Sequence, residues 1–333
     1  MDFLTLVAAL GAIAPAQSVA PAAPSATSCV MTPAERDWIG GNLAAWDRVR
    51  TRFTRLPRRS PRIILFNDRC RFDGVANRAP VWRGYPHGGK IVLPAGGEVG
   101  TGVTSFAAPG GEGEPPFFVM ALPSVWVSAK AFADPADAEL RAIFLHEFSH
   151  VAHLSVLGPA FARAEVGFKA ADNLTDDTIQ ERWSKVPAYA RSIEKERDLL
   201  FAAASEPDDR RARRLAAQAH RLMKIRQQRF FSGRNKGWKA YDDLFLTMEG
   251  IGQWTAFAWL ADPAGGRMSR ERARDTMRGS RRWWSQDQGL ALFMTIDRLF
   301  PQWPDCALRR DPVLGIDLLA IAARGGTCPT RRN

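Results

Sequence analysis

The sequence contains no apolar run of the roughly 18 to 20 residues that a membrane-spanning helix needs. Its longest candidate, residues 3–14, has about the length of the apolar core of a signal peptide, so we expect no membrane span. Internal repeats are absent, which argues against a solenoid or a propeller. No nucleic-acid-binding module is visible, and basic residues recur along the chain without interleaved aromatics, so we expect no specific nucleic-acid partner.

Cysteine is scarce, with four residues in the chain, Cys29, Cys70, Cys306 and Cys328. There is no C-x-x-C and no cysteine near a histidine, so a cysteine-based metal site is not expected. An even number of cysteines behind an export signal predicts disulfide bonds. Four cysteines allow three connectivities. Proximity along the chain favours Cys29 with Cys70 and Cys306 with Cys328.

The first residues have the pattern of a cleavable export signal. Residues 3–14 are apolar, and Ala14-Pro15-Ala16 matches an A-x-A cleavage site, although Asp2 is unusual in a signal peptide. We therefore predict a signal peptide over residues 1–16, a flexible Pro, Ala and Ser-rich leader over 17–28, and a periplasmic or secreted protein. A first core helix over residues 3–14 is the alternative.

The composition predicts a globular protein of one or two domains. Among 333 residues, 46% are hydrophobic and 24% are charged, enough to bury a sizeable core. Lys and Arg number 46 against 35 Asp and Glu, for a formal net charge of +11. Such a charge predicts attraction to anionic polymers of a cell envelope. The densest basic run, residues 210–214, is typical of a solvated helix face.

Two regions with different patterns follow the leader. Residues 29–134 predict an α/β part, with an amphipathic helix over 32–55 and then short β segments between Gly-rich turns, typical of a small antiparallel sheet with long loops. Residues 135–333 predict a mostly helical part. Its expected helices cover 136–157, 187–204, 207–231, 239–260, 270–277, 285–299 and 312–323. The predicted fold class is α+β.

One motif in the first long helix points to chemistry. Residues 146–150 form H-E-x-x-H in a chain with only five histidines. On a helix this spacing puts His146 and His150 on one face, one turn apart, so both imidazoles can bind one metal ion. Glu147 then stands beside the open coordination position as a general base. Leaving these side chains without a ligand in an apolar helix is costly.

Through this motif the sequence resembles the zincin metallopeptidases. Metzincins continue the motif with a glycine and a third histidine, where this chain has His153 and Val156. Thermolysin-like gluzincins take a third ligand from a glutamate about twenty residues further on, and residues 168–172 contain none. The resemblance is therefore to gluzincin-like enzymes with a more distant ligand, and it implies Zn²⁺ as cofactor and a peptide or protein as substrate.

Glu249 is the best candidate for the third zinc ligand. It lies in an apolar run, where an unpaired carboxylate is costly, and Gly250 and Gly252 would let another helix approach closely. The run resembles the E-G-x-x-x-aromatic helix of some gluzincin-like peptidases, with Trp254 where relatives often have tyrosine. Three other carboxylates are rivals for this role, namely Asp172, Glu165 and Glu196.

Further residues have weaker assignments. Tyr241 and Tyr189 are candidate donors to a tetrahedral intermediate, although core packing explains them as well. Gln253 could hydrogen-bond a ligand histidine. We expect His153 to be capped or to touch solvent. Residues 117–127 resemble the zincin edge strand that pairs with an extended substrate, a comparison that Pro123 weakens.

The sequence thus predicts an exported zinc metallopeptidase in which His146, His150 and Glu249 hold the metal and Glu147 and Tyr241 act in catalysis. The alternatives are a metal-binding protein without turnover and a basic protein that binds the cell envelope.

Overall fold

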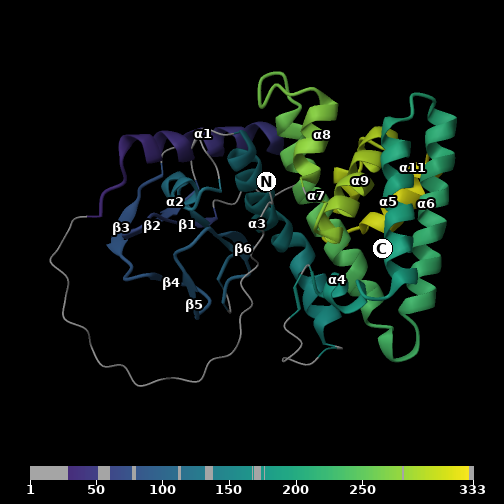
Figure 1. Cartoon of the computed structure of the whole chain (residues 1–333), viewed down its shortest axis with the longest axis horizontal. Helices are drawn as coiled ribbons and strands as arrows, with labels where there is room; N and C mark the ends of the chain where they lie inside the picture. The colour runs from purple at the N-terminus through teal and green to yellow at the C-terminus, as the bar shows by residue number, and fades with distance from the viewer. Residues whose placement is uncertain are drawn as a thin grey trace.

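The computed structural model describes residues 29–51, 61–76, 80–111, 114–131, 138–166, 168, 174–175, 177–279 and 281–329. A β-rich part and a larger helical part lie side by side, with the long helix α3 (Ala138–Glu165) between them (Figure 1). The predicted α+β class is confirmed. The signal peptide and leader predicted over residues 1–28 lie outside the described residues.

Helix α1 (Pro33–Arg50) covers the β-rich part. It begins with a capping box, in which the Thr32 hydroxyl accepts from the Glu35 backbone amide at 3.2 Å and the Glu35 carboxylate accepts from the Thr32 amide at 2.7 Å. Trp38 and Trp46 face α3, and Trp46 makes an edge-to-face contact with Phe148 at 5.4 Å between ring centroids. The predicted first helix is confirmed, with an earlier end.

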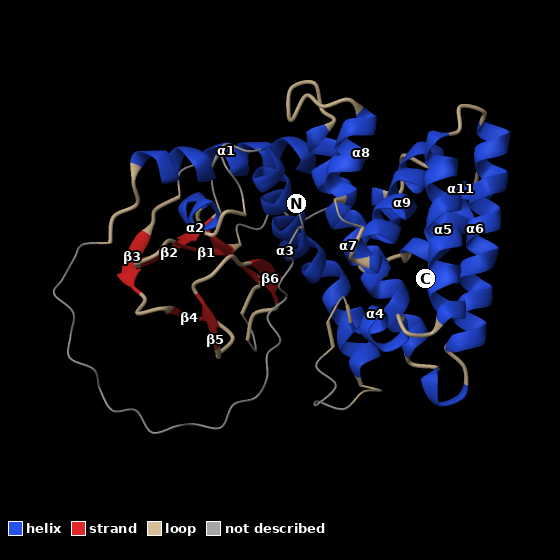
Figure 2. Cartoon of the chain, in the orientation of Figure 1, coloured by secondary structure: helices blue, strands red, loops and turns tan. Residues whose placement is uncertain are grey.

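A five-stranded sheet forms the core of this part, and a two-stranded sheet lies beside it (Figure 2). The order in the larger sheet is β3 (Arg83–Pro86), β2 (Cys70–Val75), β1 (Arg62–Phe66), β7 (Phe117–Ala121) and β6 (Ser105–Ala108). The smaller sheet pairs β4 (Lys90–Val92) with β5 (Glu98–Gly100).

A small antiparallel sheet was expected, but the strands of the five-stranded sheet run in mixed directions. β1 and β7 run parallel, and the other pairs in this sheet are antiparallel. The long segment between these two strands provides the crossover that parallel pairing requires. All of β7 and nearly all of β1 are buried, as is typical of central strands covered on both faces.

The expectation of an edge strand over residues 117–127 is wrong. β7 lies between β1 and β6, and its backbone pairs on both sides. Pro123 then begins a short helix, α2 (Pro123–Ser128), since proline fits the first helical turn. The strand at this edge of the sheet is β6, which lies beside α3.

The helical part contains the expected long helices. α7 (Trp238–Leu260) packs against α3 on one side and against α9 (Trp284–Leu299) on the other. The remaining helices are α4 (Thr178–Trp183), α5 (Pro187–Ser205), α6 (Asp209–Phe230), the 3-10 turn η2 (Gly233–Asn235), α8 (Arg270–Arg278), α10 (Pro304–Ala307) and α11 (Gly315–Arg324). Among the helices of the described residues, none is long and apolar enough to cross a bilayer.

Both predicted disulfide bonds are confirmed. Cys29–Cys70 ties the segment before α1 to β2, and Cys306–Cys328 ties the segment after α11 to α10. Each bond therefore fastens one end of the described chain to its own part of the fold. Bonds of this kind persist in oxidising compartments.

A buried ionic network joins α5 and α6 to α7 and α9. Arg226 of α6 donates to Glu196 of α5 at 2.9 Å, to Asp242 of α7 at 3.2 Å and to the hydroxyl of Tyr189 at 2.8 Å. Gln288 of α9 donates to the same Glu196 carboxylate at 2.7 Å. The Arg226 and Glu196 side chains are wholly inaccessible to solvent. This network fixes the position of α7, which borders α3 and its motif, and of α9 on the other side of α7.

We predict that Arg226→Met lowers the free energy of unfolding by about 3–5 kcal/mol, because it leaves two carboxylates buried without their cation. Urea unfolding monitored by circular dichroism measures the change. Arg210→Met on the exposed face of the same helix is the matched control and should change the free energy by less than about 0.5 kcal/mol. Equal stability of the two variants would contradict the role of the network.

Candidate metal centre

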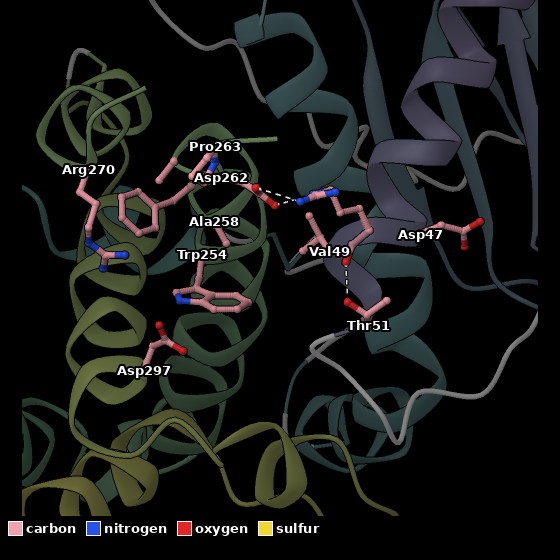
Figure 3. Close-up of a pocket in the computed structure, with 12 residues that line it drawn as sticks. Asp47, Val49, Thr51, Trp254, Ala258, Asp262, Pro263, Arg270 and Asp297 are labelled. Atoms are coloured by element: carbon pink, nitrogen blue, oxygen red, sulfur yellow. Dashed lines mark hydrogen bonds and ion pairs between the residues drawn. The ribbon is translucent and has the colours of Figure 1, made fainter. Parts of the chain in front are cut away.

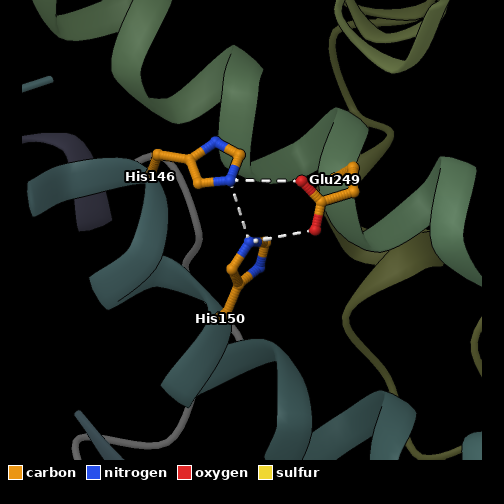
Figure 4. A group of neighbouring side chains, drawn as sticks. All are labelled: His146, His150 and Glu249. Carbon is orange, nitrogen blue, oxygen red and sulfur yellow. Dashed lines mark hydrogen bonds and ion pairs between the residues drawn. The ribbon is translucent and has the colours of Figure 1, made fainter. Parts of the chain in front are cut away.

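Three side chains from two helices converge in the core of the molecule (Figure 4). His146 and His150 lie one turn apart on α3, and Glu249 faces them from α7. The two Nε2 atoms are 3.1 Å apart. The Glu249 carboxylate oxygens lie 3.3 Å from Nε2 of His146 and 3.4 Å from Nε2 of His150.

These separations fit one metal ion. Ligand atoms at about 2.0–2.1 Å from a tetrahedral ion are about 3.3 Å from one another, close to the three observed distances. All three residues are at most 5% exposed. Within the described part of the chain, no other group of His, Cys, Asp or Glu brings three potential ligand atoms together. The centre is therefore a group that could hold a metal ion.

The protonation states suit metal binding. Burial lowers the pKa of His150 to about 4, and the neighbouring His146 lowers it further while Glu249 opposes the shift. Burial by itself would raise the pKa of Glu249, but the two histidines outweigh it and hold that pKa below its ordinary value. At neutral pH the pair thus presents a neutral imidazole and an ionised carboxylate, the forms that bind metals.

A glycine brings the two helices together at this centre. A Cβ atom at Gly252 would lie 2.8 Å from Cε1 of His150 and 3.0 Å from Nδ1 of His146. On another side of α7, a Cβ atom at Gly250 would lie 2.8 Å from the backbone oxygen of Gly289 in α9. The close approach expected at both glycines is confirmed, and only glycine provides the space for the imidazole rings.

The rival ligands lie elsewhere or outside the described residues. Glu165 is exposed at the end of α3. Glu196 is bound to Arg226 and Gln288 in the ionic network. Asp172 is outside the described residues. Of the four carboxylates considered from the sequence, Glu249 is the one that the structure brings to the histidines.

The structure does not bring either tyrosine to the centre. Tyr241 lies about two turns, or roughly 12 Å, before Glu249 on α7. Helical side chains point toward the N-terminus, so its ring extends away from Glu249. The Tyr241 hydroxyl donates to the Thr175 carbonyl at 2.6 Å, and the ring packs on Phe245. Tyr189 belongs to the ionic network. We therefore assign neither tyrosine to a reaction, which corrects the expectation for Tyr241.

Two further expectations differ from the structure. His153 is wholly buried, with its ring 5.9 Å from that of His150, rather than in contact with solvent. Among the described residues, Nδ1 of His146 and Nδ1 of His150 have no hydrogen-bond partner, so the bond expected from Gln253 to a ligand histidine is not formed. Glu147 is 4% exposed on α3, next to the first ligand.

Two residues beside the centre escaped the sequence analysis. Gln286 of α9 hydrogen-bonds to the Glu249 carboxylate. It begins a run of three buried polar residues in an apolar helix, which was a usable signal. Asp177, which precedes α4, lies close enough for the charge of Glu249 to raise its pKa. Its surroundings in the sequence gave no signal.

A cavity of about 740 Å³ lies at the C-terminal ends of α1 and α7 (Figure 3). Trp254 and Ala258 line its α7 side, and Val49 and Thr51 line its α1 side. An ion pair between Arg48 and Asp262, 2.6 Å long, joins the two helices across it. None of the three candidate metal ligands lines this cavity.

We predict that Gly252→Ala weakens metal binding by about 10- to 100-fold, the usual loss when the support of metal ligands is disturbed. The new methyl group would displace both imidazoles, whereas alanine favours the helix itself. Competition titration of Zn²⁺ with a chromophoric chelator measures the affinity. Gly158→Ala on α3, with open space around its Cβ position, is the control. Equal affinities of the two variants would contradict the proposed close approach.

Comparisons with known proteins identify no relative of this chain. No family model matches it, and neither curated proteins nor solved structures give a significant match. The zincin resemblance thus rests on the motif and on Glu249, and the function has to be argued from the geometry of the centre.

Proposed function

We propose that the protein is an exported zinc-dependent metallopeptidase. The observation that carries this proposal is the convergence of His146, His150 and Glu249 at the separations of a tetrahedral ion. Two imidazoles and one carboxylate with a position left for water are typical of catalytic zinc. The resemblance of the motif to zincins supports a peptide bond as the substrate.

Each residue has a separate task in this proposal. His146, His150 and Glu249 would hold the zinc ion, which when bound would lower the pKa of a water molecule. Glu147 would be the general base that accepts a proton during attack on the peptide carbonyl and then donates it to the leaving amine. Gln286 holds the Glu249 carboxylate in place. Burial keeps His150 neutral over the working pH range, so protons compete little for its nitrogen.

Export is supported by the two disulfide bonds, Cys29–Cys70 and Cys306–Cys328, which would be reduced in most cytosols. The pattern of residues 1–16 agrees with this, and residues 17–28 would then form a leader between the cleavage site and the first disulfide bond. We therefore place the active protein in the periplasm or outside the cell.

Zinc content and hydrolysis test the proposal together. We expect about one zinc per chain in the wild type by elemental analysis, and none in Glu249→Ala. Glu147→Gln should retain zinc and lose about 100-fold or more of its activity on a peptide library, since it lacks the general base.

Glu165→Gln is the matched control for Glu147→Gln, because Glu165 is an exposed glutamate of the same helix. It should change neither zinc content nor activity. Wild-type protein without zinc after reconstitution would refute the proposal, and so would full activity of Glu147→Gln. A zinc protein with no hydrolysis of any peptide would support the alternative of metal binding without turnover.

A second candidate function is attachment to anionic polymers of the cell envelope. On α6 the exposed residues Arg210, Arg214 and Arg221 follow one another along one face, with Ile225 on the same face 56% exposed. Burial lowers the pKa of His220 on this helix, and the nearby cations Lys224, Arg324 and Arg221 lower it further while Asp317 opposes them. Figure 1 places α6 at the outer edge of the helical part.

We predict that the triple substitution Arg210→Glu, Arg214→Glu and Arg221→Glu releases the protein from immobilised heparin at lower salt, because it removes the basic face. The control carries the same charge change at Arg163, Arg191 and Lys195, which are exposed on α3 and α5. If both variants elute together, net charge alone explains the binding and α6 is not an attachment surface.

A further inference from the structure

Two buried oxygen atoms near Glu249 lack a hydrogen-bond partner in the part of the chain that the structure describes. Gln253 lies one turn beyond Glu249 on α7 and is 5% exposed, and its Oε1 atom has no partner. Asp177 approaches from the segment before α4, and its Oδ1 atom is buried and also without a partner. Buried acceptors of this kind are costly unless a donor reaches them. Among the described residues no donor reaches either oxygen, so a ligand could supply it.

The segment that carries Asp177 is fixed in place. Thr175 accepts the hydroxyl of Tyr241, which holds the segment against α7. On the other side, the Gln180 amide donates to the Arg282 carbonyl at 2.9 Å, and its oxygen accepts from the Trp284 amide at 2.8 Å. α4 is thus attached at the N-terminus of α9, within one turn of the residue that bonds Glu249. The segment of Asp177 is therefore held between Tyr241 of α7 and the N-terminus of α9, the two helices that carry Glu249 and Gln286.

The charges around Asp177 are mainly negative. Burial raises its pKa to about 7, and the charges of Glu249 and Glu181 add to the effect, while Arg282 opposes them. Oδ1 of Asp177 has no partner among the described residues, Arg282 included. The Arg282 guanidinium instead lies over the ring of Trp283 at 4.5 Å. In a basic chain this is a local acidic region, and a cation beside Asp177 would be favoured.

We propose that Asp177 is a specificity-determining residue that binds a positively charged group of the substrate next to the metal centre. The carboxylate would pair with an ammonium or guanidinium group, and the oxygen of Gln253 would accept a substrate N–H. The inference rests on the proposed function. It adds a substrate class, namely peptides that carry a positive charge near the bond to be cleaved. The cation can be a free amino terminus or the side chain of Lys or Arg.

Binding to an inactive enzyme tests this without turnover. Zinc-loaded Glu147→Gln is titrated by calorimetry with four versions of one peptide: a free amino terminus, an acetylated terminus, an acetylated terminus with lysine beside the scissile bond, and the same with norleucine in place of lysine. We expect at least one cationic version to bind about tenfold or more tightly than its neutral counterpart, the usual effect of a charge-assisted bond in a buried site. The cationic version that is preferred identifies the source of the charge.

Asp177→Asn in the same background should abolish this preference, because it weakens the binding of the cationic peptide and leaves the binding of the neutral peptide unchanged. Asp177→Glu should restore part of it. Glu181→Gln, which removes an exposed acid one turn further on, is the control and should retain most of the preference. In the active enzyme, Asp177→Asn should raise KM for the cationic peptide with kcat nearly unchanged.

Three results would overturn the inference. Equal binding of cationic and neutral peptides by the protein with Asp177 intact removes its basis. An undiminished preference in Asp177→Asn assigns the cation to another residue. Loss of zinc in Asp177→Asn makes Asp177 a metal ligand. Failure of the proposed function would be recognised separately. The wild-type protein would then contain no zinc in elemental analysis, or it would hydrolyse no peptide of the library.

Discussion

The close contact between α3 and α7 is the constraint on which the centre depends. The two histidines are fixed relative to each other by the geometry of a single helix, but the carboxylate comes from a helix far along the chain. Gly252 lets the α7 backbone approach the imidazole rings, and Gly250 lets α9 approach α7 from another side. A larger residue at either position would separate a pair of helices. Two small residues in one turn thus determine whether three ligand atoms can share one ion.

The ionic network around Arg226 supports this contact from a point further toward the N-terminus of α7. Asp242 and Glu249 lie on the same helix, about two turns apart. A network that fixes Asp242 therefore also fixes the position of Glu249 along the axis of α7. On α9, Gln288 and Gln286 lie two residues apart, and Gln288 bonds Glu196 while Gln286 bonds Glu249. The α5 and α6 pair, which has no ligand of its own, therefore acts as a support for the ligand helices.

The sequence predicted what local spacing determines. The H-E-x-x-H motif, the long helices and both disulfide bonds follow from neighbours in the chain, and the structure has them. Glu249 could also be predicted, since a lone carboxylate in an apolar run requires an explanation. The parallel pairing of β1 and β7 and the interior position of β7 could not be predicted, because both depend on which side of β1 the chain reaches after the crossover. Gln286 and Asp177 reach the centre only through the packing of α9 and α4, which no spacing in the sequence reveals.

Two clusters of buried polar groups lie in the helical part, and they differ in how their charges are satisfied. Around Arg226, one guanidinium faces two carboxylates and a hydroxyl, so the chain supplies both the cation and the anions, and among the described residues only Nη2 of Arg226 and Oε1 of Gln227 are left without a partner there. At the candidate metal centre, two Nε2 atoms and a carboxylate face one another, each neutral imidazole has a single N–H, and both Nδ1 atoms lack a partner among the described residues. Both clusters are buried, so both have to offset the same kind of desolvation cost. The first contains a cationic side chain that faces its carboxylates, whereas the second consists of two imidazoles and a carboxylate and could offset this cost by holding a metal ion. This difference is the strongest physical reason to regard the second cluster as a binding site and the first as structural support.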